Sequence, residues 1–225
     1  MCRAVGNHDG YWYDGTNKFY YTDAQIYDLF LREESIAQNK HFGGEGTYYY
    51  IDEIASKVRF IVLDTNDGTV ETEQLTWLEN TALSFSESGW DVVLISHQPI
   101  SNHYHAGISN AEAIRTIIRN HINGTDVNKA NVVGCFSGHI HRDRIYTGVA
   151  TDTKTDAEGA AMGFTQVTIT SDANIDYDRL GGVTGLERDM NGDTSHAIDF
   201  VTINKNTRTV NITRLGSGED RSYSY

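Results

Sequence analysis

Two patterns of hydrophobic residues alternate along the first two thirds of the chain. Short apolar or β-branched runs predict strands, and apolar residues spaced three or four positions apart predict helices. We predict helices over residues 23–38, 71–83 and 109–122, and strands over residues 47–51, 57–63, 90–95 and 131–136. After Arg142 the pattern predicts strands alone, over residues 144–149, 163–169, 197–203 and 209–215.

This order of elements is typical of a layered α/β or α+β domain. No internal repeat and no linker divides the sequence, so we predict that residues 1–225 form one domain. Residues 172–195 are rich in Gly and Asp, and apolar alternation resumes after them. We therefore interpret this stretch as a long surface loop rather than as a domain boundary.

The composition is globular, with 39% hydrophobic and 22% charged residues, and the formal net charge is −13. Such an acidic chain argues against a nucleic-acid-binding surface and against binding to an anionic membrane, because both need clustered Lys and Arg. No apolar run reaches the roughly 18 residues of a membrane-spanning helix. If this protein binds a phosphate, we expect a metal ion to provide the attraction.

Three of the predicted loops carry histidine directly after a short apolar run. They are Gly6–Asp9 (GNHD), Ser96–Pro99 (SHQP) and Gly138–His141 (GHIH). Loops at the carboxyl ends of buried strands are where such sheets place their binding sites, so we expect the three loops to converge. A lone histidine is more often structural, but three loops of this kind favour a site.

Metal binding is the chemistry that these side chains suit. Imidazole nitrogens and an amide oxygen bind first-row transition ions, and a glycine lets the backbone turn sharply beside the ion. His139 and His141 are two positions apart, so they share one face of a strand or, on a turn, serve two neighbouring ions.

The three motifs, in this order, resemble those of the calcineurin-like metallophosphoesterases. Thr72–Leu78 (TEQLTWL) also resembles the stretch between the third and fourth motifs of that family. The resemblance covers essentially the whole chain. It implies a four-layer αββα sandwich of two mixed β-sheets flanked by helices, and a two-metal centre that activates hydroxide to hydrolyse phosphomonoesters or phosphodiesters.

The resemblance also implies which residues bind metal. Asn7, His97 and His139 are expected to hold one ion, and His141 is expected to bind the other. The ions are expected to be Mn²⁺, Fe or Zn²⁺, and the ligand types alone do not choose among them, because imidazole suits several metals.

Catalytic and substrate-binding roles follow from the same resemblance. His8 is expected to contact the scissile phosphate, as a general acid for the leaving oxygen or as an electrostatic stabiliser. Asp9 is expected to hydrogen-bond His8 and to fix its tautomer. His103, His105 and Tyr11 are candidates for the rim of the substrate pocket, with exposed loop polarity or simple packing as the alternatives.

Two motifs of the family are absent. No histidine follows an aspartate by two positions, and the single Gly-Asp pair, Gly192-Asp193, lies far downstream. We therefore expect a chain that lacks the first strand–helix–strand unit of the family, and with it both anionic ligands. We predict at most one bound ion here, against two in a complete enzyme, and impaired activity.

Taken together, these features predict a metallophosphoesterase domain with a phosphate ester as substrate. The alternative, from a different class, is a non-catalytic binding or assembly module that retains the fold. An unpaired sheet edge left by the absent strands predicts a homo-oligomer. Localisation stays open, because a targeting segment could precede Met1.

Overall fold

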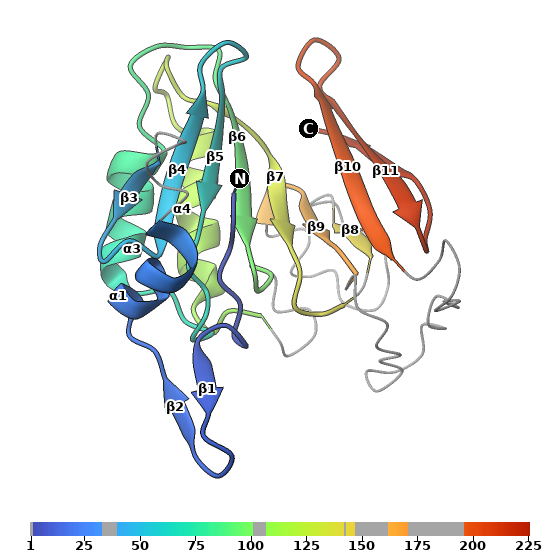
Figure 1. Ribbon diagram of the computed structural model, residues 1–225. Helices are drawn as coiled ribbons and strands as arrows, with labels where there is room; N and C mark the ends of the chain where they lie inside the picture. The colour runs from blue at the N-terminus through green and yellow to red at the C-terminus, as the bar shows by residue number, and fades with distance from the viewer. Residues whose placement is uncertain (1, 33–39, 101–106, 142, 147–161, 171–195) are drawn as a thin grey trace.

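The computed structural model describes residues 2–32, 40–100, 107–141, 143–146, 162–170 and 196–225. At its centre lies a mixed sheet of seven strands in the order β3-β4-β5-β6-β7-β9-β8 (Figure 1). The strands are β3 His41–Gly43, β4 Tyr48–Glu53, β5 Val58–Val62, β6 Asp91–Ser96, β7 Asn131–Ser137, β8 Arg144–Tyr146 and β9 Gln166–Thr168. Strands β5, β6, β7 and β9 pair in parallel, and the other pairs are antiparallel.

Helices cover one face of this sheet. They are α3 Thr72–Trp77, the π-helical segment η2 Leu78–Ala82 that continues it, and α4 Ala111–Asn123. Helix α4 turns Ile114 and Ile118 inward, where they are fully buried in one cluster with Leu94 of β6. Each such side chain contributes about 1.5–3 kcal/mol by leaving water.

A second, antiparallel sheet packs on part of the opposite face (Figure 1). Its strands are β10 Ala197–Asn204, β11 Thr209–Gly216 and β12 Arg221–Ser224. Val210 and Ile212 of β11 are buried against Val93 and Val133 of the central sheet. The predicted α+β sandwich is confirmed. Its second sheet is antiparallel rather than mixed, because the described part of this sheet consists of consecutive strands that pair with their neighbours in the sequence.

The N-terminal segment lies on the remainder of that face, beside α1 Asp23–Ile26 and the π-helical segment η1 Tyr27–Leu31 (Figure 1). Val5 is buried there. Arg3 is tied to the sheet twice: its backbone N–H donates to Tyr49 Oη at 2.7 Å, and Tyr49 Oη donates to the Arg3 carbonyl at 3.1 Å. These contacts hold the segment from which the first histidine loop begins.

A hairpin that the pattern analysis missed projects from the body at the bottom of Figure 1. It pairs β1 Tyr11–Tyr13 with β2 Lys18–Tyr20. Asp14 closes the turn, because its Oδ1 accepts from the N–H groups of Thr16 and Asn17. Strands β3 and β12 were also missed.

The other predicted elements are confirmed to within a few residues, where the structure describes them. The predicted loop 172–195 and the end of the first predicted helix lie outside the described residues. Within the described ranges, no helix has the length and apolar character needed to cross a membrane.

Candidate active site

The histidine loops meet at one edge of the central sheet. His97 follows β6 and His139 follows β7, so parallel strands deliver both side chains to the same end. His97 Nε2 lies 3.0 Å from Asn7 Oδ1 and 3.2 Å from His139 Nδ1. The structure thus brings the three expected ligands of one ion together, as predicted from the order of the loops.

Close approach of the N-terminal loop depends on Gly6. A Cβ atom at this position would lie 2.9 Å from two atoms of the His97 ring, closer than real contacts allow. His139 and His141 have φ angles of 64° and 53°, in the left-handed region that costs a residue with a side chain about 1–2 kcal/mol. Such backbone strain is concentrated at functional sites.

Burial keeps these imidazoles neutral. Desolvation first, and then the neighbouring His139, lower the pKa of His97 to about 4, while the carboxylate of Asp9 acts in the opposite direction. The pKa of His139 is lowered by burial and then by His141 and His8. Neutral rings expose nitrogen lone pairs at neutral pH, which is the form that binds a metal.

Hydrogen bonds among Asn7 Oδ1, His97 Nε2 and His139 Nδ1 cannot satisfy all three atoms at once. Asn7 Oδ1 only accepts, and a neutral imidazole carries a single ring hydrogen. If His97 Nε2 carries its hydrogen, that hydrogen cannot point at both Asn7 Oδ1 and His139 Nδ1. If His97 Nε2 carries no hydrogen, its lone pair faces a lone pair of Asn7 Oδ1. A cation at this point would satisfy all three atoms.

The partner of His8 differs from the expected one. His8 Nδ1 lies 2.5 Å from the hydroxyl of Tyr11, whereas the Asp9 carboxylate turns back and accepts from the Gly6 N–H at 2.9 Å. The prediction that Asp9 hydrogen-bonds His8 is therefore wrong for this structure. The reason is local: Asp9 closes a tight turn, in which its own N–H also donates to the Gly6 carbonyl.

His141 lies near the cluster without joining the contacts around His97 Nε2. It is half-buried, and its positive charge would lower the pKa of both His97 and His139. Its backbone carbonyl accepts from Thr170 Oγ1 at 3.2 Å. The rim candidates His103 and His105 lie outside the described residues.

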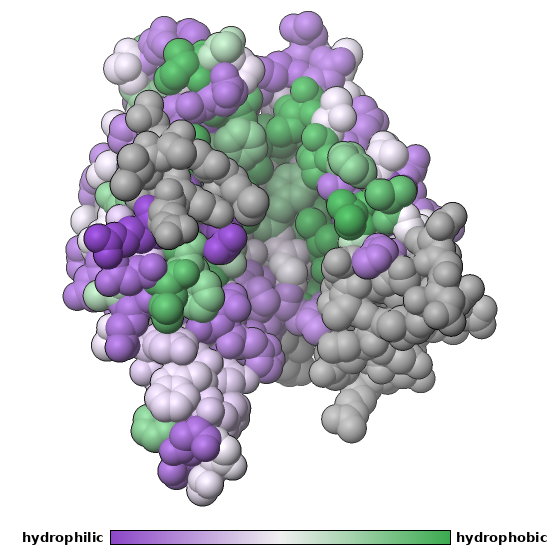
Figure 2. Space-filling view, in the orientation of Figure 1, coloured by the Kyte–Doolittle hydropathy of each residue, from purple (hydrophilic) through white to green (hydrophobic). Residues whose placement is uncertain are grey.

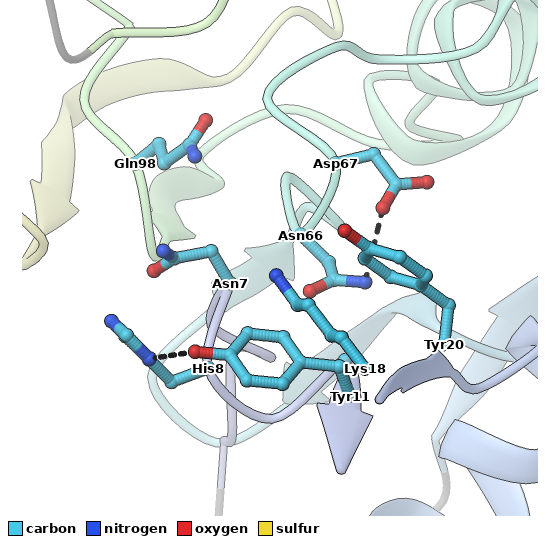
Figure 3. A pocket seen from close by; sticks show the side chains of 9 residues that line it. Asn7, His8, Tyr11, Lys18, Tyr20, Asn66, Asp67 and Gln98 are labelled. Atoms are coloured by element: carbon cyan, nitrogen blue, oxygen red, sulfur yellow. Dashed lines mark hydrogen bonds between the residues drawn. The ribbon is translucent and has the colours of Figure 1, made fainter. Parts of the chain in front are cut away.

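A cleft of about 440 Å³ opens beside the cluster (Figure 3). Its lining combines the GNHD loop, the β1–β2 hairpin and the loops after β5 and β6, through Asn7, His8, Gly10, Tyr11, Lys18, Tyr20, Asn66, Asp67 and Gln98. Tyr11 was a rim candidate, but Lys18, Tyr20, Asn66, Asp67 and Gln98 were missed. The Asp14-Gly15 pair between two aromatic runs is a hairpin signal that could have indicated Lys18 and Tyr20.

The donor set of the cluster suits a divalent transition ion. Neighbouring ligands of an ion bound at about 2.1 Å are themselves roughly 3 Å apart, which matches the 3.0 and 3.2 Å separations found here. Within the part of the chain that the structure describes, no three His, Cys, Asp or Glu side chains form a metal-binding group. The third donor of this cluster is the amide oxygen of Asn7, and no carboxylate of the described residues joins it.

A layered α+β sandwich with histidine loops at one end agrees with the resemblance stated above, and comparisons with known proteins show that the chain is similar to phosphodiesterases. The chain is 31% identical over 160 residues to the cyclic GMP-AMP phosphodiesterase SMPDL3A of Mus musculus. It is 29% identical to the proteins of the same name from Rattus norvegicus, over 160 residues, and Bos taurus, over 165 residues.

Each alignment covers 63% of this chain and 34% of the relative, so the chain spans about a third of the length of these phosphodiesterases. No family model matches the chain. The sequence of this chain is therefore similar to that of these phosphodiesterases over about a third of their length.

Proposed function

We propose that this chain hydrolyses a phosphodiester in the cleft beside Asn7 and His8, with one divalent transition ion held by Asn7, His97 and His139. The convergence of three neutral donor atoms on one point carries this proposal. When bound, the ion supplies Lewis-acid polarisation of a phosphoryl oxygen. The diester class is taken from the relatives, which are cyclic GMP-AMP phosphodiesterases.

Electrostatics support the need for an ion. The protein carries a formal net charge of −13, and the described lining of the cleft holds one lysine and one aspartate. The lining side chains alone therefore offer a phosphate little net attraction. An ion held by neutral ligands keeps its full charge, which makes the local field positive.

Two side chains have separate tasks in this proposal. Asn7 faces both the donor cluster and the cleft, so it places the ion beside the substrate. His8 lines the cleft with a ring nitrogen that can give a proton to the leaving oxygen. The described donor atoms are all neutral, which predicts weaker ion binding than a site with a carboxylate would have.

Hydrolysis of bis(p-nitrophenyl) phosphate in the presence of Mn²⁺ tests the proposal. We expect activity that needs the ion and falls more than about 100-fold in His97→Ala, since even the outer partners of metal ligands are worth 10–100-fold. His41→Ala is the matched control, because His41 stacks on Tyr50 at the surface, away from the cluster. Activity that survives in His97→Ala would contradict the proposal. Stoichiometric Mn²⁺ binding without hydrolysis would instead favour the non-catalytic binding module.

We also propose that two copies of the chain associate through β10. This strand lies at the edge of its sheet among the described strands, and its side chains Ile198, Phe200 and Val201 are exposed. Figure 2 shows hydrophobic surface on the side of the molecule where β10 and β11 lie. An apolar strand at the edge of a sheet favours pairing with another strand. Sedimentation velocity should show a dimer that dissociates in Val201→Lys, whereas a monomer for the unmodified chain would refute the proposal.

A further inference from the structure

His8 is held by a phenol instead of the carboxylate that follows it in the sequence. We propose that Tyr11 is a positioning residue for His8: its hydroxyl holds Nδ1, so that Nε2 carries the proton for the leaving oxygen. The Nδ1–Oη distance is 2.5 Å, and the two ring centroids are 5.7 Å apart. This inference rests on the proposed hydrolysis and adds a residue and a direction of proton transfer to it.

The surroundings of Tyr11 favour the phenol as the donor in this hydrogen bond. Lys18 Nζ lies 3.6 Å from the centroid of the Tyr11 ring and 4.7 Å from that of Tyr20. A cation over the ring stabilises negative charge that develops on the phenol oxygen. A hydrogen bond with Tyr20 raises the pKa of Lys18, which keeps the ammonium charged.

The other nitrogen of His8 is free for chemistry. Within the described part of the chain, the one hydrogen bond of the ring is the contact of Nδ1 with Tyr11. In Figure 3, Nδ1 faces Tyr11, and Nε2 lies on the far side of the ring from that contact. A ring that accepts at Nδ1 carries its hydrogen on Nε2.

The bonds and protons of the step balance. The oxygen of an attacking water bonds to phosphorus while the bond between phosphorus and the leaving oxygen breaks. The electron pair of the broken bond stays on the leaving oxygen, which takes the Nε2 proton, and the attacking water gives up a proton to the solvent of the cleft. The Tyr11 proton moves to Nδ1, so His8 ends neutral with its hydrogen on the other nitrogen. The resulting phenolate faces the Lys18 ammonium, and water in the cleft returns the proton after the product leaves.

Long-range ¹H–¹⁵N correlation spectra of the full chain at pH 8 test the hydrogen bond without requiring catalysis. His8→Gln identifies the His8 resonances. We expect a protonated Nε2 and an unprotonated Nδ1 whose resonance shifts in Tyr11→Phe but not in Tyr13→Phe. Tyr13 is the matched control, since it is an exposed tyrosine on the same hairpin. A proton on Nδ1 in the unmodified chain, or an unchanged Nδ1 resonance in Tyr11→Phe, would overturn the inference.

The dependence of kcat on the leaving group tests the same role in hydrolysis. Nitrophenolate leaves without a proton, whereas an alkoxide needs one. Because general acids contribute about 10²–10⁴-fold, we expect Tyr11→Phe to lower kcat about tenfold for alkyl leaving groups, with little change for nitrophenyl ones or in KM. Lys18→Gln should show the same pattern with a smaller loss.

Failure of this inference can be told apart from failure of the proposed function. If His97→Ala is inactive but Tyr11→Phe loses kcat equally for all leaving groups, the hydrolysis stands and the role of Tyr11 is refuted. If His97→Ala retains activity, the proposed function falls, whatever the spectra show.

Discussion

Two polar clusters in this molecule differ in how far their polar atoms are paired with one another. In the C-terminal sheet, Arg214 and Asp199 are 1% and 3% exposed and are joined by Asp143 and Arg221. Two cations meet two anions there, and each carboxylate oxygen accepts from an arginine N–H group. In the loop cluster, Asn7, His97 and His139 bring three neutral atoms together with too few hydrogens to satisfy them.

The difference separates a cluster that stabilises the fold from the cluster that we propose binds an ion. In the arginine cluster the charges balance and all four carboxylate oxygens accept hydrogen bonds, although the buried Nε of Arg221 has no hydrogen-bond partner among the described residues. The arginine cluster also fixes the loop behind His141, since Asp143 Oδ1 accepts from the Thr170 N–H at 3.1 Å. We propose that a cation completes the histidine cluster, and one of its members, His139, lies on the loop next to Asp143.

Breaking the arginine cluster should have the largest effect on stability. We expect Arg214→Met to lower the free energy of unfolding by about 3–5 kcal/mol, because two carboxylates lose their buried partner. Urea denaturation followed by circular dichroism measures this loss. Glu87→Gln is the control: its pair with Lys57 is exposed, and such pairs contribute about 0–1 kcal/mol. Equal effects of the two substitutions would contradict the contrast between the clusters.

Widening the histidine cluster should weaken ion binding and leave the fold intact. In Gly6→Ala the added methyl group pushes against the His97 ring, so we expect Mn²⁺ affinity to fall about tenfold, or about 1.4 kcal/mol. Gly138→Ala is the matched control, since its Cβ would approach only the His97 carbonyl, at 4.0 Å. Titration calorimetry measures the Mn²⁺ affinity of both variants. Equal affinities would contradict the prediction that ion binding depends on the close packing of Gly6 against the His97 ring.

A third region, rich in acidic residues, should give the smallest effect. Burial first, and then the charges of Asp64 and other nearby carboxylates, raise the pKa of Asp23 to about 6. The folded state therefore binds more protons than the unfolded state between about pH 4 and 6, and stability falls as the pH rises through this window. We expect Asp23→Asn to raise the melting temperature by about 2 °C at pH 7 and to leave it unchanged at pH 4. Calorimetric scans at both values check the sign, and a lower melting temperature at pH 7 would refute it.

The sequence pattern was informative where a periodic signal was strong. The apolar run WDVVLI predicted β6, and the spacing of Ile114 and Ile118 predicted the buried face of α4. The order of the histidine loops after such runs predicted that they would converge. The short strands β3 and β12 carry too few residues for a periodic signal.

Features that depend on contacts between distant parts of the chain were beyond the sequence. One local contact was also beyond the sequence: nothing in GNHD shows that the Asp9 carboxylate turns back to the Gly6 N–H. The Arg214 cluster joins residues 71 and 15 positions apart, and no linear motif links them. Lys18 reaches the cleft because the β1–β2 hairpin returns it to the GNHD loop, which the pattern analysis did not predict.

Titration calorimetry of the full chain with Mn²⁺ or Zn²⁺ tests whether Asn7, His97 and His139 bind an ion. We predict one ion per chain, with binding lost in His97→Ala and retained in His41→Ala. Absence of binding in the unmodified chain, two tightly held ions, or equal binding in His97→Ala would contradict this prediction.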